Sequence, residues 1–270
     1  MKKVVLLFSP GLDSYLANTV LSKMKDTDLH RIYFDCCKYS FNETCFMRDR
    51  YKVSTINNEA EVKISHDFYF EPIEGPDSYI PNRNLMFVTA ASSRYPDADE
   101  IYINSMKDDR APDSDKSLFE KYAPILSKSI GKKVEIKSLF WEKEKAHAIN
   151  EYIANGGSKF DLLLHTYSCF DEYYNERELQ VYSCLETVSG NMYEYLGTFP
   201  VTGCLECAAC FRKACALTAS NIYIPFENKK LADEYKYKFD SNLSIYYPER
   251  SMTITKYLDF LNNGPKDISI

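Results

Sequence analysis

The chain has 270 residues, of which 45% are hydrophobic and 27% are charged. This length and composition allow one large α/β domain with a small appendage, or two modest domains, to bury a core without disulfides. The formal net charge of −6 argues against a broad nucleic-acid-binding surface, which normally needs a basic face.

The hydrophobic pattern shows neither a secretion signal nor a membrane helix. The apolar run that follows Lys2 and Lys3 stops at Ser9-Pro10-Gly11, which is too short for the apolar core of a signal peptide. No stretch approaches the length of about 18 apolar residues that a membrane-spanning helix needs. We therefore expect a cytoplasmic protein that makes no membrane contact and binds no nucleic acid directly.

Strand and helix patterns alternate through the first part of the chain. Continuous apolar runs predict buried strands at residues 4–8, 31–35, 61–64, 100–104 and 134–136. Amphipathic patterns predict helices at residues 13–24, 41–58, 84–94, 118–130 and 143–154, with a loop at 66–80. Strands that alternate with helices predict an α/β fold with a parallel sheet and right-handed crossovers.

The pattern changes after about residue 165, where cysteines become frequent and the periodicity fades. We therefore expect a nucleotide-binding domain at residues 1–165 and a metal-binding region with an insertion at 166–225. Residues 226–270 are polar and are predicted to form a tail of one or two helices.

The turn after the first strand has the features of an anion site. Its sequence is Ser9-Pro10-Gly11-Leu12-Asp13-Ser14, and a helix is predicted to follow. Backbone N–H groups at such a turn and the helix dipole attract phosphate, while the two serines can add hydroxyl donors. Gly11 would let the backbone approach a phosphate closely, and Asp13 could hold a Mg²⁺ ion.

An ordinary strand-to-helix turn with a serine or aspartate cap is the alternative interpretation. The segment is neither a Walker A loop, because no Gly-Lys-Ser/Thr follows, nor the three-glycine dinucleotide fingerprint.

Cysteine spacing predicts a metal site. The chain has nine cysteines, an odd number, and two consecutive C-x-x-C steps place Cys204, Cys207 and Cys210 together. Such spacing lets thiolates converge on a tetrahedral zinc ion, and a closed four-thiolate site would be structural. A 4Fe–4S cluster is the chemical rival, and unrelated buried cysteines are the alternative. The nearby Arg212 and Lys213 could offset the thiolate charge. The candidates for a fourth ligand are Cys169, Cys184 and Cys215.

The turn resembles the PP-loop of the ATP-pyrophosphatase superfamily, whose pattern is Ser-Gly-Gly-x-Asp-Ser. Pro10 departs from that pattern and removes one N–H donor. Most of the chain between residues 3 and 217 resembles the 7-cyano-7-deazaguanine synthase (QueC) family. Further segments carry the likeness in the family's order: Tyr79-Ile80-Pro81-Asn82-Arg83-Asn84-Leu85-Met86-Phe87, Ile103-Asn104 with Asp108-Asp109 and Pro112-Asp113, Lys143-Glu144-Lys145-Ala146, Thr166-Tyr167-Ser168-Cys169-Phe170, and the C-x-x-C-x-x-C run.

The resemblance implies a Rossmann-like PP-loop domain (adenine nucleotide alpha hydrolase-like) with a small C-terminal zinc-binding region. It implies ATP, Mg²⁺ and Zn²⁺ as cofactors. The implied nucleotide-binding residues are Ser9, Gly11, Leu12, Asp13, Ser14 and Phe34. The implied catalytic residues are Asp13, Arg83, Lys145, Asp109 and Asp113. For the last four of these, a surface or capping role is the alternative. The implied zinc ligands are Cys169, Cys204, Cys207 and Cys210, with Cys184 as the alternative to Cys169.

The family activity implied is an ATP-dependent C–N ligase that adenylates 7-carboxy-7-deazaguanine and converts it with ammonia to the amide and then the nitrile. The implied partners are the deazapurine substrate and ammonia, with a homodimer as the expected assembly.

Several departures keep alternatives open. The segments 34–38 and 112–116 differ from the family pattern, and residues 171–203 are an insertion between Cys169 and Cys204. A similar enzyme could pass the activated acid to a protein amine, as in QueC-like antiviral defence. A binding module with an inactive loop is a second alternative, motivated by Pro10. A thiolation enzyme that uses Cys36 or Cys37 is a third.

Overall fold

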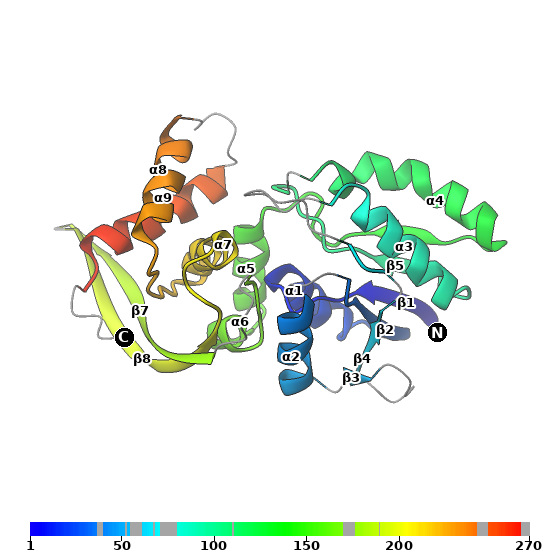
Figure 1. Ribbon diagram of the computed structural model, residues 1–270, viewed down its shortest axis with the longest axis horizontal. Coiled ribbons are helices and arrows are strands. Elements are labelled where there is room, and N and C mark those ends of the chain that lie inside the picture. The colour runs from blue at the N-terminus through cyan, green and yellow to red at the C-terminus, as the bar shows by residue number, and fades with distance from the viewer. Residues whose placement is uncertain are drawn as a thin grey trace. The chain divides into compact units, whose positions relative to one another are not determined.

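The computed structural model describes residues 1–36, 40–51, 53–54, 61–66, 68–70, 80–109, 111–169, 176–188, 190–241 and 248–265. These residues form two compact units, Met1–Lys143 and Glu144–Ile270, shown in Figure 1. The units are spatial bodies, and the three domains expected from the sequence remain a prediction. Cys37, Tyr79 and Phe170, together with most of the predicted loop at 66–80, lie outside the described residues.

The first unit is built on a six-stranded sheet in the order β3-β4-β2-β1-β5-β6, and every neighbouring pair is parallel. The strands are β1 (Lys2–Leu7), β2 (Thr27–Phe34), β3 (Val53–Ser54), β4 (Val62–Ser65), β5 (Glu100–Tyr102) and β6 (Glu135–Lys137). The helices are α1 (Leu12–Leu21), α2 (Ser40–Arg50), α3 (Arg83–Arg94) and α4 (Lys116–Ile130), with a 3₁₀ turn η1 (Pro112–Ser114). The predicted α/β fold with a parallel sheet is confirmed.

The buried side chains of the strands and of the covering helices form one continuous core. Val5, Leu7, Ile32 and Ile101 from three adjacent strands are almost fully buried, and Val88 of α3 packs with them. Parallel strands covered by crossover helices need such near-continuous apolar runs. The core therefore fixes the positions of the strand ends, where the polar turns begin.

One predicted helix was too long. The sequence predicted helix at 41–58, but α2 ends at Arg50 and residues Val53–Ser54 form β3. Val53 pairs with Val62 of β4, and a β-branched residue is better accommodated on a pleated surface than in a helix.

The second unit combines helices with an antiparallel hairpin. Its elements are α5 (Lys145–Ala154), α6 (Lys159–Leu164), β7 (Glu176–Thr187), β8 (Gly190–Thr202), α7 (Ala208–Leu217), a 3₁₀ turn η2 (Thr218–Ser220), α8 (Lys229–Ser241) and α9 (Pro248–Asn263). The predicted tail of one or two helices corresponds to α8 and α9. None of the described helices has the length and apolar character needed to cross a lipid bilayer.

Aromatic side chains form the core of this unit and explain part of the high tyrosine content. Phe211 of α7 packs against Tyr257 of α9, with ring centroids 5.6 Å apart. Phe260, one helical turn further on, contacts Tyr182 of β7 and Tyr223. These contacts hold the hairpin against α9. The residues between Cys169 and Cys204 thus include a packed hairpin at 176–202.

Candidate phosphate loop and metal centre

The turn between β1 and α1 lies at the topological switch point of the sheet. From β1 the chain goes first to β2 on one side, and later to β5 on the other. In open α/β sheets, ligands bind at the carboxyl ends of the strands where the order reverses. The sheet therefore places the Ser9-to-Ser14 turn where this architecture normally binds a ligand.

Hydroxyl groups organise the turn. The Ser9 N–H donates to Ser14 Oγ at 3.2 Å, and the two serine hydroxyls lie 3.0 Å apart. The Gly11 N–H points at Ser9 Oγ at 3.4 Å. Gly11 has φ −64° and ψ 156°, which any residue can adopt, but a Cβ there would lie 3.3 Å from Ser9 Oγ. In this turn, glycine leaves room for the Ser9 hydroxyl.

The first turn of α1 has the backbone arrangement that can attract an anion. Gly11 is its N-cap residue and makes no side-chain capping bond, and the first intrahelical bond runs from the Tyr15 N–H to the Gly11 carbonyl at 3.0 Å. Helix geometry provides no intrahelical acceptor for the first-turn N–H groups, which carry the positive end of the dipole. Leu12 is buried beneath the turn, and Asp13 is half-buried in it.

Asn104 was not assigned a role from the sequence, although it was part of a segment quoted for the resemblance. It follows β5, and its Nδ2 donates both to the Leu7 carbonyl and to Ser14 Oγ, the latter at 2.8 Å. It therefore ties the end of β5 to the turn across the switch point. The signal in the sequence was its position as the last residue of the predicted strand at 100–104.

Phe34 and Arg83 lie near each other through a shared neighbour. Phe34 is buried and stacks on Phe87 of α3, with centroids 4.7 Å apart and rings 7° from parallel. The exposed Arg83 places its Cζ 6.0 Å from the Phe87 ring centroid. Phe34 is thus part of an aromatic cluster at the carboxyl end of β2, and Arg83 covers that cluster at the start of α3.

Each of the two predicted aspartates accepts a hydrogen bond from a backbone N–H group. Asp113 is buried, and its Oδ2 accepts a hydrogen bond from the Asn84 N–H at 3.0 Å in the first turn of α3. Asp109 is exposed, and its Oδ2 accepts from the Met106 N–H at 2.8 Å. The Asp113 contact is of the helix-capping kind, and the catalytic role of both aspartates remains a prediction. Lys145 is half-buried and begins α5 in the second unit.

Four cysteines of the second unit converge on one point. The sulfur atoms of Cys169, Cys204, Cys207 and Cys210 all lie within 4.8 Å of one another, although Cys169 is separated from the others by the hairpin. The Cys204 and Cys210 sulfurs are 3.9 Å apart, and those of Cys169 and Cys207 are 4.0 Å apart. Neither Cys184 nor Cys215 belongs to this group.

The backbone around the cluster is shaped for thiolates. The Cys207 N–H points at Cys204 Sγ at 3.3 Å, and Cys207 Sγ caps α7 by accepting from the Cys210 N–H at 3.5 Å. Leu205 has φ 62°, which closes the tight turn. Gly203 has φ 146°, and a Cβ there would lie 3.0 Å from Cys210 Sγ. The conformation of this segment depends on the sulfur positions.

The donor set fits a tetrahedral ion. Zinc–thiolate bonds of about 2.3 Å imply sulfur–sulfur distances of about 3.8 Å, close to the 3.9 Å and 4.0 Å of two pairs in the cluster. Thiol hydrogen bonding, chiefly from Cys204, lowers the pKa of Cys169 to about 7. The hydrogen bond to Cys169 raises the pKa of Cys204. One thiol is therefore already poised to deprotonate, as a ligand must.

Lys213 is a buried cation beside this cluster. It is 6% exposed, and its Nζ donates to the Thr166 carbonyl at 2.5 Å. Burial lowers the pKa of Lys213 to about 8, while Cys210 and Cys169 act in the opposite direction. A buried ammonium is costly unless a negative charge accompanies it, and a metal bound by four thiolates would supply that charge.

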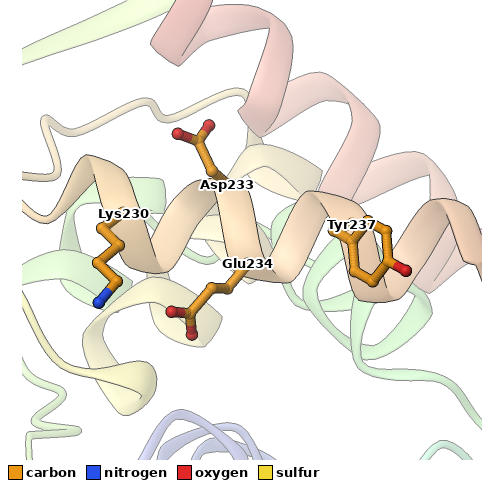
Figure 2. A pocket seen from close by; sticks show the side chains of 4 residues that line it. All are labelled: Lys230, Asp233, Glu234 and Tyr237. Atoms are coloured by element: carbon orange, nitrogen blue, oxygen red, sulfur yellow. The ribbon is translucent and has the colours of Figure 1, made fainter.

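A surface depression lies elsewhere, along α8. Figure 2 shows its lining residues Lys230, Asp233, Glu234 and Tyr237, all of which come from that single helix. Its volume is about 640 Å³. None of the residues predicted for the site lines it.

Comparisons with known proteins give one family match. A family model described as queuosine biosynthesis protein QueC matches residues 38–221, a span that begins after the phosphate loop and includes all four clustered cysteines. No curated protein matches the chain.

Two solved structures show weak similarity. U34-tRNA thiolase NcsA from Methanococcus maripaludis, with its 4Fe–4S cluster, is 14% identical with a TM-score of 0.34. The match covers 57% of this chain and 56% of the thiolase, so the chain spans little more than half of that protein's length. A predicted subunit of tRNA methyltransferase from Methanocaldococcus jannaschii is 11% identical with a TM-score of 0.29, covering 73% of this chain and 97% of that one.

Proposed function

This chain belongs to the family of the queuosine biosynthesis protein QueC, and from that premise we propose that it is an ATP-dependent ligase that adenylates a 7-deazaguanine carboxylate. Ammonia then converts the activated acid to the amide and the nitrile. The observation that carries the proposal is the turn after β1, where serine hydroxyls and the first turn of α1 gather at the switch point of a parallel sheet.

The chemistry explains why ATP is needed. A carboxylate is a poor electrophile because its charge repels a nucleophile and oxide is a poor leaving group. Its oxygen attacks the α-phosphorus of ATP, pyrophosphate leaves, and an acyl adenylate forms. Ammonia attacks the acyl carbon, AMP leaves, and the amide forms. The amide oxygen then attacks the α-phosphorus of a second ATP, and pyrophosphate and one N–H proton leave. Loss of AMP and of the remaining N–H proton gives the nitrile.

Few side chains need to react in such a sequence, because positioning and charge stabilisation dominate. We assign Ser9, Gly11 and the first turn of α1 to the phosphates. The half-buried carboxylate of Asp13 has the hard oxygen donors that Mg²⁺ prefers, and it would hold that ion. When bound, Mg²⁺ neutralises phosphate charge. Arg83 is the residue we assign to phosphate charge as it develops in the transition state.

We assign Cys169, Cys204, Cys207 and Cys210 to a structural zinc site. Their number and spacing suit a closed tetrahedral site with no open position for substrate. The ion would link the two ends of the β7–β8 segment, and its role would be to stabilise the fold of the second unit.

Incubation of the protein with ATP, Mg²⁺, ammonium and 7-carboxy-7-deazaguanine tests the proposal. Mass spectrometry should detect the nitrile, with AMP and pyrophosphate formed alongside it. Asp13→Ala should abolish pyrophosphate release while the variant keeps its metal content and fold. If wild-type protein releases no pyrophosphate under these conditions, the ligase assignment is wrong and the binding-module alternative is favoured.

A second candidate is favoured by the hairpin. Near its tip the β7–β8 hairpin exposes Leu185, Val188 and Met192, each of them 47% exposed or more, and exposed apolar groups of this kind suit a protein contact. Such an enzyme would transfer the activated acid to a protein amine. In the same assay it would release AMP and pyrophosphate from the acid but form little nitrile with ammonia alone.

A further inference from the structure

The direction of the hydrogen bonds around the phosphate loop can be assigned from their acceptors. A serine hydroxyl can donate or accept, and an asparagine amide can be placed either way round. One contact removes this ambiguity. Asn104 Nδ2 meets the Leu7 carbonyl, which can only accept, so this end of the amide carries the hydrogens.

The hydroxyl of Ser14 is then fully determined. The Asn104 Nδ2, at 2.8 Å, and the Ser9 N–H, at 3.2 Å, both donate to Ser14 Oγ. These two donors use both lone pairs of the oxygen. The remaining contact, 3.0 Å to Ser9 Oγ, must therefore use the hydrogen of Ser14. The hydrogen bonds thus form a series in which Asn104 donates to Ser14 and Ser14 donates to Ser9.

The same count applies to Ser9. Its Oγ accepts from Ser14 and from the Gly11 N–H at 3.4 Å, which fills both lone pairs. Its own hydrogen therefore has no acceptor among the residues that the structure describes. The Ser9 O–H is left as a donor to whatever occupies the loop, and only a group that accepts can satisfy it.

We infer that Asn104 is a positioning residue that acts through Ser14 and directs the Ser9 O–H toward a phosphate oxygen. Phosphate oxygens are acceptors with high charge density, and a hydroxyl donor to them makes a strong hydrogen bond. The donor also replaces the N–H that Pro10 lacks at the next position. This inference rests on the proposed function and adds to it the group that selects the phosphate.

Removal of the Asn104 side chain should reverse the direction of the hydrogen bond between Ser14 and Ser9. One lone pair of Ser14 Oγ would become vacant, and the Ser9 O–H could turn inward to donate to it. The outward donor would be lost although Ser9 itself is still present. A role of Asn104 as a simple clip between β5 and β1 would not couple it to Ser9 in this way.

A double-mutant cycle separates the two roles. Calorimetry would measure the affinity for Mg·ATP and for magnesium pyrophosphate in wild type, Asn104→Ala, Ser9→Ala and the double variant. Each single change should weaken binding about tenfold or more, the effect of a hydrogen bond to a charged group. The double variant should lie within about twofold of Ser9→Ala alone, because neighbours that act as a unit are not additive.

Asn18→Ala is the matched control. Asn18 lies one helical turn after Ser14 in α1, and its amide oxygen accepts a hydrogen bond from Arg31 Nε at 2.5 Å. This variant loses a buried amide on the same helix, so its thermal stability should fall while its nucleotide affinity stays near that of wild type.

A further comparison remains decisive if Asn104→Ala does not fold. Because the Ser14 hydrogen is used on Ser9, Ser14→Ala should weaken binding clearly less than Ser9→Ala does. The reverse order, or additive effects in the cycle, would overturn the inference and leave the proposed function intact. If wild-type protein binds neither ligand, the inference and the proposed function both fail.

Discussion

Replacement of Lys213 by methionine should leave the metal-free protein at least about as stable as wild type but should weaken metal binding. The side chain is almost fully buried, and its pKa is lowered from 10.5 to about 8. At about 1.4 kcal/mol per pKa unit, the buried charge destabilises the metal-free fold at neutral pH by about 3 kcal/mol. Methionine removes that cost.

The lost hydrogen bond acts the other way. The Thr166 carbonyl loses its donor, and a buried acceptor without a partner costs about 1–3 kcal/mol. The metal-free variant should therefore be about as stable as wild type, or slightly more so. Removal of a typical buried paired lysine, in contrast, would be strongly destabilising.

The metal affinity of Lys213→Met, in contrast, should be lower than that of wild type. Four thiolates around a divalent ion carry a net negative charge, and Lys213 is the buried cation beside them. Loss of a residue that supports the ligands commonly lowers metal affinity about 10- to 100-fold. Chelator competition would measure that loss, and urea unfolding of the chelator-treated protein would measure the metal-free stability.

The pH dependence of the metal-free stability gives a second check, because its direction follows from the lowered pKa of Lys213. Unfolded lysine holds its proton to about pH 10.5, whereas folded Lys213 loses it near pH 8. The stability of metal-free wild type relative to Lys213→Met should therefore rise between these pH values. Arg212→Met, at the half-buried neighbouring position, is the control and should show no such rise. An unchanged metal affinity in Lys213→Met, together with a large loss of metal-free stability, would refute the reasoning.

Three further outcomes are expected. Cys169→Ser should lower the zinc affinity and the amount of bound zinc measured by mass spectrometry. Cys184→Ser should keep its zinc, because Cys169 belongs to the cluster and Cys184 does not. Equal zinc in both variants would exclude Cys169 as a ligand. Burial acts to raise the pKa of Glu100, but hydrogen bonds from its two lysine partners hold it below the usual value. Glu100→Gln should therefore cost about 1–2 kcal/mol near neutral pH, with a difference that shrinks as acid protonates the wild-type carboxylate; a difference constant with pH would contradict this. Gly203→Ala should weaken metal binding, because its φ of 146° and the 3.0 Å approach to Cys210 Sγ leave no space for a methyl group; an unchanged chelator titration would show that the backbone adapts.

The first unit could be predicted because its strands are buried on both faces. Runs such as residues 4–8 are continuously apolar, and the predicted helices between them carry amphipathic patterns, so type and order follow from periodicity. The predicted end of α2 at residue 58 was wrong because Val53 pairs with Val62 of β4, a contact that periodicity within the helix cannot reveal.

The hairpin could not be recognised because its strands do not alternate cleanly. Most residues of β8 are exposed or half-exposed, and Gly197 and Pro200 interrupt its strand pattern. Its burial comes from α9, through side chains such as Phe260. The packing of a later helix, rather than the local sequence, therefore makes the segment a hairpin.

Three members of the cysteine cluster were foreseen from spacing and the fourth, Cys169, from the family resemblance, whereas the link to Asn104 was not foreseen. C-x-x-C steps bring three sulfurs together within a few residues, so local sequence is sufficient there. Asn104 reaches the phosphate loop only because β5 pairs with β1, although their sequences are almost 100 residues apart. No local pattern encodes such a contact.

The phosphate loop has no lysine, arginine or histidine within residues 9–14. In the proposed site, attraction for an anion would come from dipoles: backbone amides, hydroxyls and the start of α1. Mobile ions screen an exposed point charge over roughly 10 Å at 0.1 M ionic strength, but they have little access to short dipolar contacts at a backbone turn. The grip of this turn on a phosphate should therefore persist at salt concentrations that would disable a site built on surface lysines.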